Sequence, residues 1–90
     1  NRKNDPYYWI NRGQEYLQQG STDRAVAALE RAQELTTGFA EVHRYLAQAY
    51  LLLGKTAKAQ EQLTLLAHID QQDPTLPTLQ SKLLSKKLRY

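Results

Sequence analysis

The sequence contains an internal repeat with a period of 34 residues. When the chain is shifted by that distance, five residues meet an identical partner: Tyr16 and Tyr50, Gly20 and Gly54, Thr22 and Thr56, Ala25 and Ala59, Leu29 and Leu63. A fixed period of this length is typical of stacked supersecondary units, because a single unit cannot bury its own apolar face. The repeat therefore predicts a stacked array and favours a function in recognition.

Apolar residues between the turn signals recur every three or four positions, which is the spacing of a half-buried helix. We expect helices over about 6–19, 22–37, 39–53 and 56–70, and a fifth that starts between 74 and 77. Their apolar stripes are Trp9, Ile10, Tyr16 and Leu17; Ala25, Ala28, Leu29, Ala32 and Leu35; Val42, Leu46, Ala49, Tyr50 and Leu53; Ala59, Leu63, Leu66 and Ile69; and Leu76, Leu79, Leu83 and Leu88, with Leu84 beside the last. No segment alternates as a strand does.

Capping residues mark the ends of these helices. Asp5 is an expected N-cap with Pro6 in the first turn, and Ser21 or Thr22 is expected to cap the second helix. Gly20 and Gly54 follow the first and third helices, where glycine accepts the left-handed conformation of a helix end. Each glycine turn is short, so it predicts that the two helices fold back on each other.

The residues at these positions resemble the tetratricopeptide repeats. The first copy has Trp9, Gly13, Tyr16, Gly20, Ala25, Leu29 and Ala32, and the second has Leu46, Ala47, Tyr50, Gly54, Ala59 and Leu63. The resemblance implies an all-α fold of antiparallel helix-turn-helix repeats stacked as a short right-handed α-superhelix. It implies a single domain over 1–90, with repeat 1 at about 6–39, repeat 2 at about 40–73 and a C-terminal capping helix at about 74–90.

Several positions depart from the family pattern. Arg12, Thr37, Leu66 and Gln71 differ from the usual residues, and His43 stands where a large aromatic is common. We expect His43 to be packed and neutral in place of that aromatic. The fifth helix is either a capping helix or the first helix of an incomplete third repeat. Its aromatic, small and tyrosine positions are occupied by Pro77, Ser81 and Leu84, which do not fit the repeat pattern, so the sequence favours the capping helix.

By resemblance, the first helix of each pair lines a concave groove suited to a peptide or a partner's helix. The expected lining is polar and aromatic, and it has no packing role in the helical stripes: Tyr7, Asn11, Gln14, Gln18, Glu41, Arg44, Tyr45, Gln48, Leu52, Lys82, Ser85 and Lys86. We expect Arg44, Tyr45 and Gln48 to contribute most, since Tyr and Arg are frequent in binding surfaces. The alternative is an ordinary solvated helix face.

One family ligand is disfavoured. Chaperone-binding members hold a terminal carboxylate with a clamp of basic and amide side chains on these helices. The matching places here carry Ile10, Gln14, Tyr45, Thr75 and Thr78. Because none of these side chains is a cation that could pair with a carboxylate, the sequence argues against a chaperone tail as the partner.

The charge of the chain is uneven. Its net charge is +3, and residues 74–90 hold Lys82, Lys86, Lys87 and Arg89 without an acid. These cations suit a helix C-terminus, and an acidic partner is the second interpretation. Four charges on one helix form a weak footprint for nucleic acid, so we expect a protein or peptide partner and no nucleic acid. The longest apolar run, 49–53, is too short for membrane insertion.

The sequence gives no sign of an active site. It has no cysteine, only His43 and His68 as histidines, and no metal-binding spacing or glycine-rich phosphate loop. We therefore expect no catalytic residue, metal or cofactor. The chain lacks methionine, so we expect it to be a piece of a larger protein or a processed form. The sequence leaves its location open, since cytoplasm and periplasm are both compatible with it. A protein-interaction module is the main prediction, and a structural module that self-associates or docks on a neighbouring domain is the alternative.

Overall fold

The computed structural model of this chain describes residues 2–88. Throughout those residues the regular structure is helical: a 3₁₀ turn η1 (Arg2–Asn4), then α1 (Pro6–Gln18), α2 (Thr22–Leu35), α3 (Ala40–Leu52), α4 (Thr56–Ile69) and α5 (Leu76–Lys87). The predicted all-α class is confirmed, and the first four helices end within two residues of the predicted bounds. Residues 89 and 90 of the expected capping helix lie outside the described part, as does the charge of Arg89.

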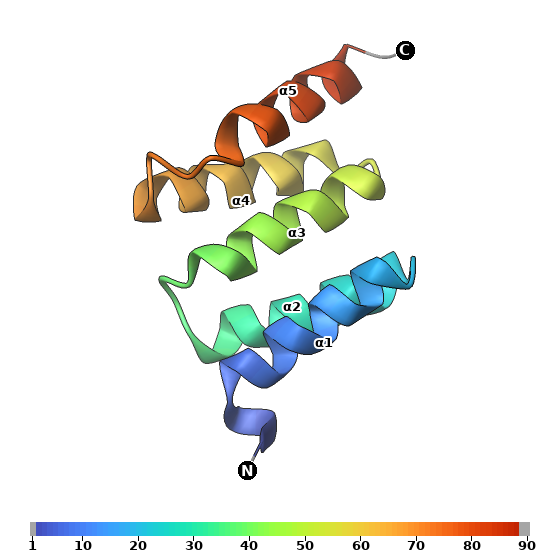
Figure 1. The fold of residues 1–90 in the computed structure, drawn as a ribbon. Coiled ribbons are helices and arrows are strands. Elements are labelled where there is room, and N and C mark those ends of the chain that lie inside the picture. Colours follow the sequence, from blue (N-terminus) through green and yellow to red (C-terminus); the bar gives the residue numbers. More distant parts are fainter. Residues whose placement is uncertain (1, 89–90) are drawn as a thin grey trace.

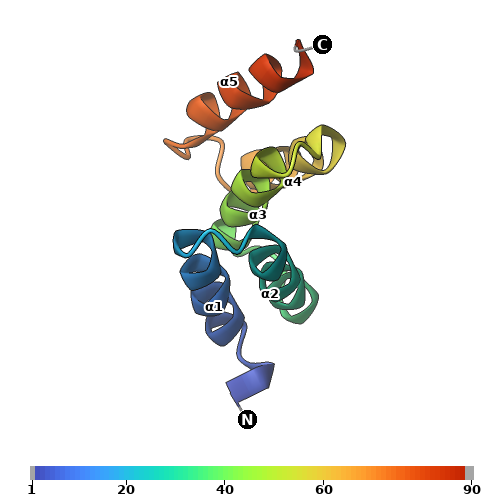
Figure 2. The ribbon, with the colours of Figure 1, turned by 90° about the vertical axis from the view of Figure 1, so that its right-hand side faces the viewer.

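The five helices stack along one axis. α1 packs against α2, α3 packs against α4, and α2 contacts α3, which joins the two pairs. α5 packs on α4 and also touches α3. Figure 1 shows the resulting order from the N-terminal pair to α5, over an extent of 44 Å along the longest axis. In Figure 2, α1, α3 and α5 form one side of the stack, and α2 and α4 form the other.

The two glycine turns have the same geometry. φ is +80° at Gly20 and +74° at Gly54, so both lie in the left-handed region that suits glycine. The N–H after each glycine donates to the carbonyl of Tyr16 or Tyr50, at 2.8 Å in both turns. Each glycine N–H donates to the carbonyl three residues earlier, at 3.1 Å. These paired bonds satisfy the last carbonyls of α1 and α3 and reverse the chain.

Helix starts differ in how they are capped. The side chain of Asp5 accepts a bond of 2.9 Å from the N–H of Tyr7, with Pro6 first in α1, so the predicted cap is confirmed. Ser21 immediately precedes α2, but its side chain makes no capping bond, so that part of the prediction is wrong for Ser21. Its backbone carbonyl instead accepts from Ala25 at 3.0 Å.

Small residues let the paired helices approach closely. A Cβ at Gly13 would lie 2.5 Å from Cγ of Leu29, so α1 and α2 touch at this point with no room for a side chain. Ala47 and Ala59 are fully buried in the α3–α4 pair. The core joins all five helices: Ile10, Leu29, Ala32, Val42, Leu46, Ala47, Tyr50, Leu51, Ala59, Leu63, Leu66, Leu76, Leu79 and Leu83.

Two residues of the predicted stripes, and one leucine expected beside a stripe, are exposed. Ile69 is the last residue of α4 and Leu88 follows the end of α5, so both lie beyond the reach of the neighbouring helices. Leu84, expected beside the stripe, is 58% exposed. The apolar spacing of a helix therefore extends to a few residues that no neighbouring helix buries.

Candidate functional site

The predicted groove residues lie on the helices that form one side of the stack. The structure brings five of them, Gln48, Leu52, Lys82, Ser85 and Lys86, together in one hollow, and it places Tyr7 and Asn11 in a separate depression on α1. The remaining predicted residues lie in neither hollow: Gln14, Gln18, Glu41, Arg44 and Tyr45. Tyr7 also stacks at a tilt on Phe39, with 5.1 Å between ring centroids. The site therefore has its best-formed part at the C-terminal end of the predicted groove.

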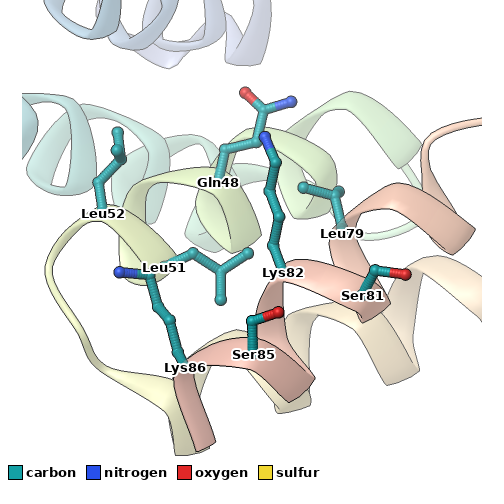
Figure 3. A pocket seen from close by; sticks show the side chains of 8 residues that line it. All are labelled: Gln48, Leu51, Leu52, Leu79, Ser81, Lys82, Ser85 and Lys86. Atoms are coloured by element: carbon teal, nitrogen blue, oxygen red, sulfur yellow. The ribbon is translucent and has the colours of Figure 1, made fainter. Parts of the chain in front are cut away.

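That part, called here the α3–α5 hollow, lies between the C-terminal half of α3 and the middle of α5 (Figure 3). Its volume is about 480 Å³, and it is open on one side. It is lined by Gln48, Leu51, Leu52, Leu79, Ser81, Lys82, Ser85 and Lys86. Leu51 and Leu79, which belong to the core, were not predicted as site residues.

The lining combines an apolar floor with a cationic rim. Leu51 and Leu79 are almost fully buried, whereas Leu52 is 66% exposed. Figure 3 shows Lys82 and Lys86 reaching from α5 toward α3 across the hollow. No acidic residue is among the lining side chains. Such a hollow suits an apolar side chain, with a carboxylate next to it that pairs with the ammonium groups.

Arg44 has a structural role that the sequence did not indicate. Its Nη2 donates to Oδ2 of Asp73 at 2.6 Å, and the side chain of Asp73 is 1% exposed. The expectation that Arg44 has no packing role is therefore wrong. The two residues are 29 positions apart, and Asp73 lies in the polar break before α5, so helical periodicity gave no signal for the pair.

Asp73 also holds the start of α5. Its Oδ1 accepts from the backbone N–H of Thr75 at 2.8 Å and from the Thr75 hydroxyl. Its backbone carbonyl accepts from Leu76, the first residue of α5, at 3.1 Å. The Arg44–Asp73 pair thus ties α3 to the first turn of α5, and it fixes the two walls of the α3–α5 hollow.

The Asp73 carboxylate makes stability depend on acid pH. Burial alone would raise the pKa of Asp73, but the bonds from Arg44 and Thr75 outweigh it and lower the pKa from 3.8 to about 2. A lowered pKa contributes stability above pH 4 that is lost as the pH falls toward 2. We expect this carboxylate to account for a loss of about 2 kcal/mol in unfolding free energy over that window. Urea unfolding at pH 5, 4, 3 and 2 measures it, with Asp73→Asn as the variant that should lose less on acidification. An identical acid dependence in the two proteins would contradict the assignment.

Two other buried polar contacts join the helices. Nδ1 of His43 lies 2.7 Å from Oε1 of Gln62, which links α3 to α4 and confirms that His43 is packed. Its neutral state stays a prediction. The hydroxyl of Tyr50 donates to Glu30 at 2.8 Å, which links α3 to α2. The pKa of Tyr50 is raised, mainly because the phenol is buried and also because of this hydrogen bond. His68 is exposed on α4. These contacts join neighbouring helices of the stack.

Within residues 2–88, no group of three or more His, Asp or Glu side chains is arranged to hold a metal ion. Across the same part of the chain, every helix is too short or too polar to span a bilayer.

Comparison with known proteins gives one family. A model described as tetratricopeptide repeat matches residues 16–83, which is more than half of the chain. The matched stretch runs from the last turn of α1 into α5 and so includes the whole of α2, α3 and α4. None of the curated proteins matches this sequence.

Proposed function

The chain belongs to the tetratricopeptide repeat family, and from this premise we propose that it binds a peptide segment of a partner protein along α1, α3 and α5. Repeats of this family generally mediate protein–protein interaction and are typically not catalytic. The division into repeat 1 (6–39), repeat 2 (40–73) and a cap (74–90), and the right-handed superhelix, are parts of the same proposal. The groove of such a stack follows the first helix of each pair.

The α3–α5 hollow is the observation that carries the proposal. It offers an apolar floor, the exposed Leu52 and two ammonium groups without an acidic neighbour in the lining. We infer that the segment places an apolar side chain on Leu51 and Leu79 and a carboxylate between Lys82 and Lys86. Gln48 supplies an amide at the same rim. Tyr7, Asn11, Gln14, Gln18, Glu41 and Tyr45 extend the surface along α1 and α3, whereas Arg44 acts through its pair with Asp73.

A peptide display experiment tests this assignment. Random 12-residue peptides are selected on the intact chain, and we expect the enriched ones to share an apolar residue next to Asp or Glu. Lys82→Glu should weaken their binding about tenfold or more, since it places a like charge where the carboxylate binds. Thermal stability should change little, because Lys82 is exposed.

Lys87→Glu is the matched control. It makes the same charge change on the same helix, but Lys87 does not line the hollow. Binding of the selected peptides should therefore be nearly unchanged in Lys87→Glu. Peptides that bind equally well to Lys82→Glu, or an absence of enrichment, would refute the groove assignment. Light scattering of the chain across concentration separates this function from self-association, which stays the alternative prediction.

A further inference from the structure

The two lysines of the α3–α5 hollow have no carboxylate partner among the described residues. Within residues 2–88, neither Lys82 nor Lys86 forms an ion pair. By contrast, Arg12, Arg31 and Arg44 lie 3.9, 2.9 and 2.6 Å from carboxylate oxygens of the chain. No acidic side chain lines the hollow itself. The hollow therefore offers two positive charges to a ligand.

The fold of α5 accounts for only one of these two cations. Lys82 and Lys86 are four positions apart, so their side chains leave the same face of the helix, where like charges are slightly destabilising. The helix dipole favours a cation in the last turn, which holds Lys86 and Lys87. Lys82 precedes that turn. A ligand with more than one negative charge would explain why the two cations stand together.

Neutral hydrogen-bond donors accompany the two ammonium groups. The lining includes the hydroxyls of Ser81 and Ser85 on α5 and the side-chain amide of Gln48 on α3. In Figure 3, Lys82 and Lys86 extend from the wall that carries the serines toward the wall that carries Gln48. An ammonium group has three N–H donors, an amide two and a hydroxyl one, so both walls can donate to an oxyanion.

The number of charges indicates which oxyanion fits. A carboxylate has a single negative charge and two oxygens, so it leaves one of the two ammonium groups unmatched. A phosphodiester of a nucleic acid also has a single charge. A phosphorylated side chain has about 1.5 to 2 negative charges at pH 7 and three strong acceptor oxygens. The volume of about 480 Å³ leaves room for this group beside an apolar side chain.

We propose that the partner segment presents a phosphorylated serine or threonine to Lys82 and Lys86, next to an apolar residue that lies on Leu51 and Leu79. The short side chain keeps the phosphate close to its apolar neighbour. A carboxylate at the same place binds more weakly, so phosphorylation of the partner strengthens the interaction. This inference rests on the proposed function, because it names the acidic group of the same peptide segment.

Four peptide libraries test the charge requirement. Each contains 12-residue peptides that are random except at the sixth position, which is serine, aspartate, sulfoserine or phosphoserine. Sulfoserine matches phosphoserine in shape and in its terminal oxygens but has a single negative charge. The best-binding sequences are made with each of the four residues, and their affinity for the intact chain is measured by fluorescence polarisation.

We expect the phosphoserine form of a sequence to bind about fivefold or more tightly than its aspartate and sulfoserine forms. That factor corresponds to one further unit charge at about 4 Å from an ammonium group in water. Added salt should reduce the difference.

Variants of the chain locate the charge. Lys86→Gln should weaken the phosphoserine form by a larger factor than the aspartate form, because the phosphate has more charge to lose contact with. Lys87→Gln is the matched control: it makes the same change one residue away, and Lys87 does not line the hollow. Its affinity for both forms should be nearly that of the parent chain.

The outcomes separate this inference from the function on which it rests. If aspartate peptides bind and their phosphoserine forms bind no more tightly, the groove assignment stands and the inference is wrong. If no library binds, both are wrong. Equal affinity of the sulfoserine and phosphoserine forms would also overturn the inference, since one charge would then suffice. Displacement of the phosphoserine peptides by an equal concentration of a 12-nucleotide oligothymidylate would assign the hollow to nucleic acid instead and overturn it too.

Discussion

Leu63→Ala is expected to lower the free energy of unfolding by about 2 to 5 kcal/mol. Leu63 is fully buried and belongs to the core that joins all five helices. The substitution removes apolar contacts and leaves a cavity that the closely packed helices cannot fill. Because a domain of this size has a total stability of roughly 5 kcal/mol or somewhat more, the variant should be close to unfolding at 25 °C.

Leu65→Ala is the matched control for that prediction. It makes the same chemical change two residues away on α4, but Leu65 is 42% exposed. We expect its cost to stay below about 1 kcal/mol. Urea unfolding followed by circular dichroism measures both variants. Similar losses of unfolding free energy in the two variants would mean that Leu63 is not a core residue.

Much of this core could be predicted because it repeats. Leu29 and Leu63 share one position in the period and are both fully buried, and Ala25 and Ala59 behave in the same way. The turn glycines were equally predictable, since a left-handed helix end favours glycine at Gly20 and Gly54. In each case a local pattern and a repeated pattern point to the same residue.

What the periodicity could not predict is which apolar positions find a neighbour. The helical spacing placed Ile69 and Leu88 in buried stripes, yet both are exposed. A stripe reports one side of a helix, whereas burial requires a second element at the right height along it.

The candidate site was predictable in part. The family resemblance indicated Gln48, Leu52, Lys82, Ser85 and Lys86, which the structure brings into one hollow. It did not indicate that Leu79 serves both the core and the floor of that hollow. Nor did it indicate the bond between Arg44 and Asp73, because contacts between residues far apart in sequence depend on how α5 returns to α3.

Arg44→Ala is the second substitution with a large expected effect. It leaves the carboxylate of Asp73, which is 1% exposed, without its cation. Removing one partner of a buried ion pair costs about 3 to 5 kcal/mol, since the remaining charge is desolvated and unpaired. The pair also ties α3 to the start of α5, so we expect the amides of α5 to exchange with solvent faster in the variant. Urea unfolding and amide hydrogen exchange measure the two effects.

A double variant separates the lost pairing from any general disturbance. Arg44→Met with Asp73→Asn removes both charges, and the side-chain amide oxygen introduced at position 73 can still accept the N–H of Thr75 that Asp73 accepts now. Nε of Arg44 is buried without a hydrogen-bond partner, so the native pair is itself incompletely satisfied. We therefore expect the double variant to recover most of the stability that Arg44→Ala loses. If Arg44→Ala were as stable as the parent chain, or the double variant less stable than the single one, the pair would not be what fixes α5 on α3.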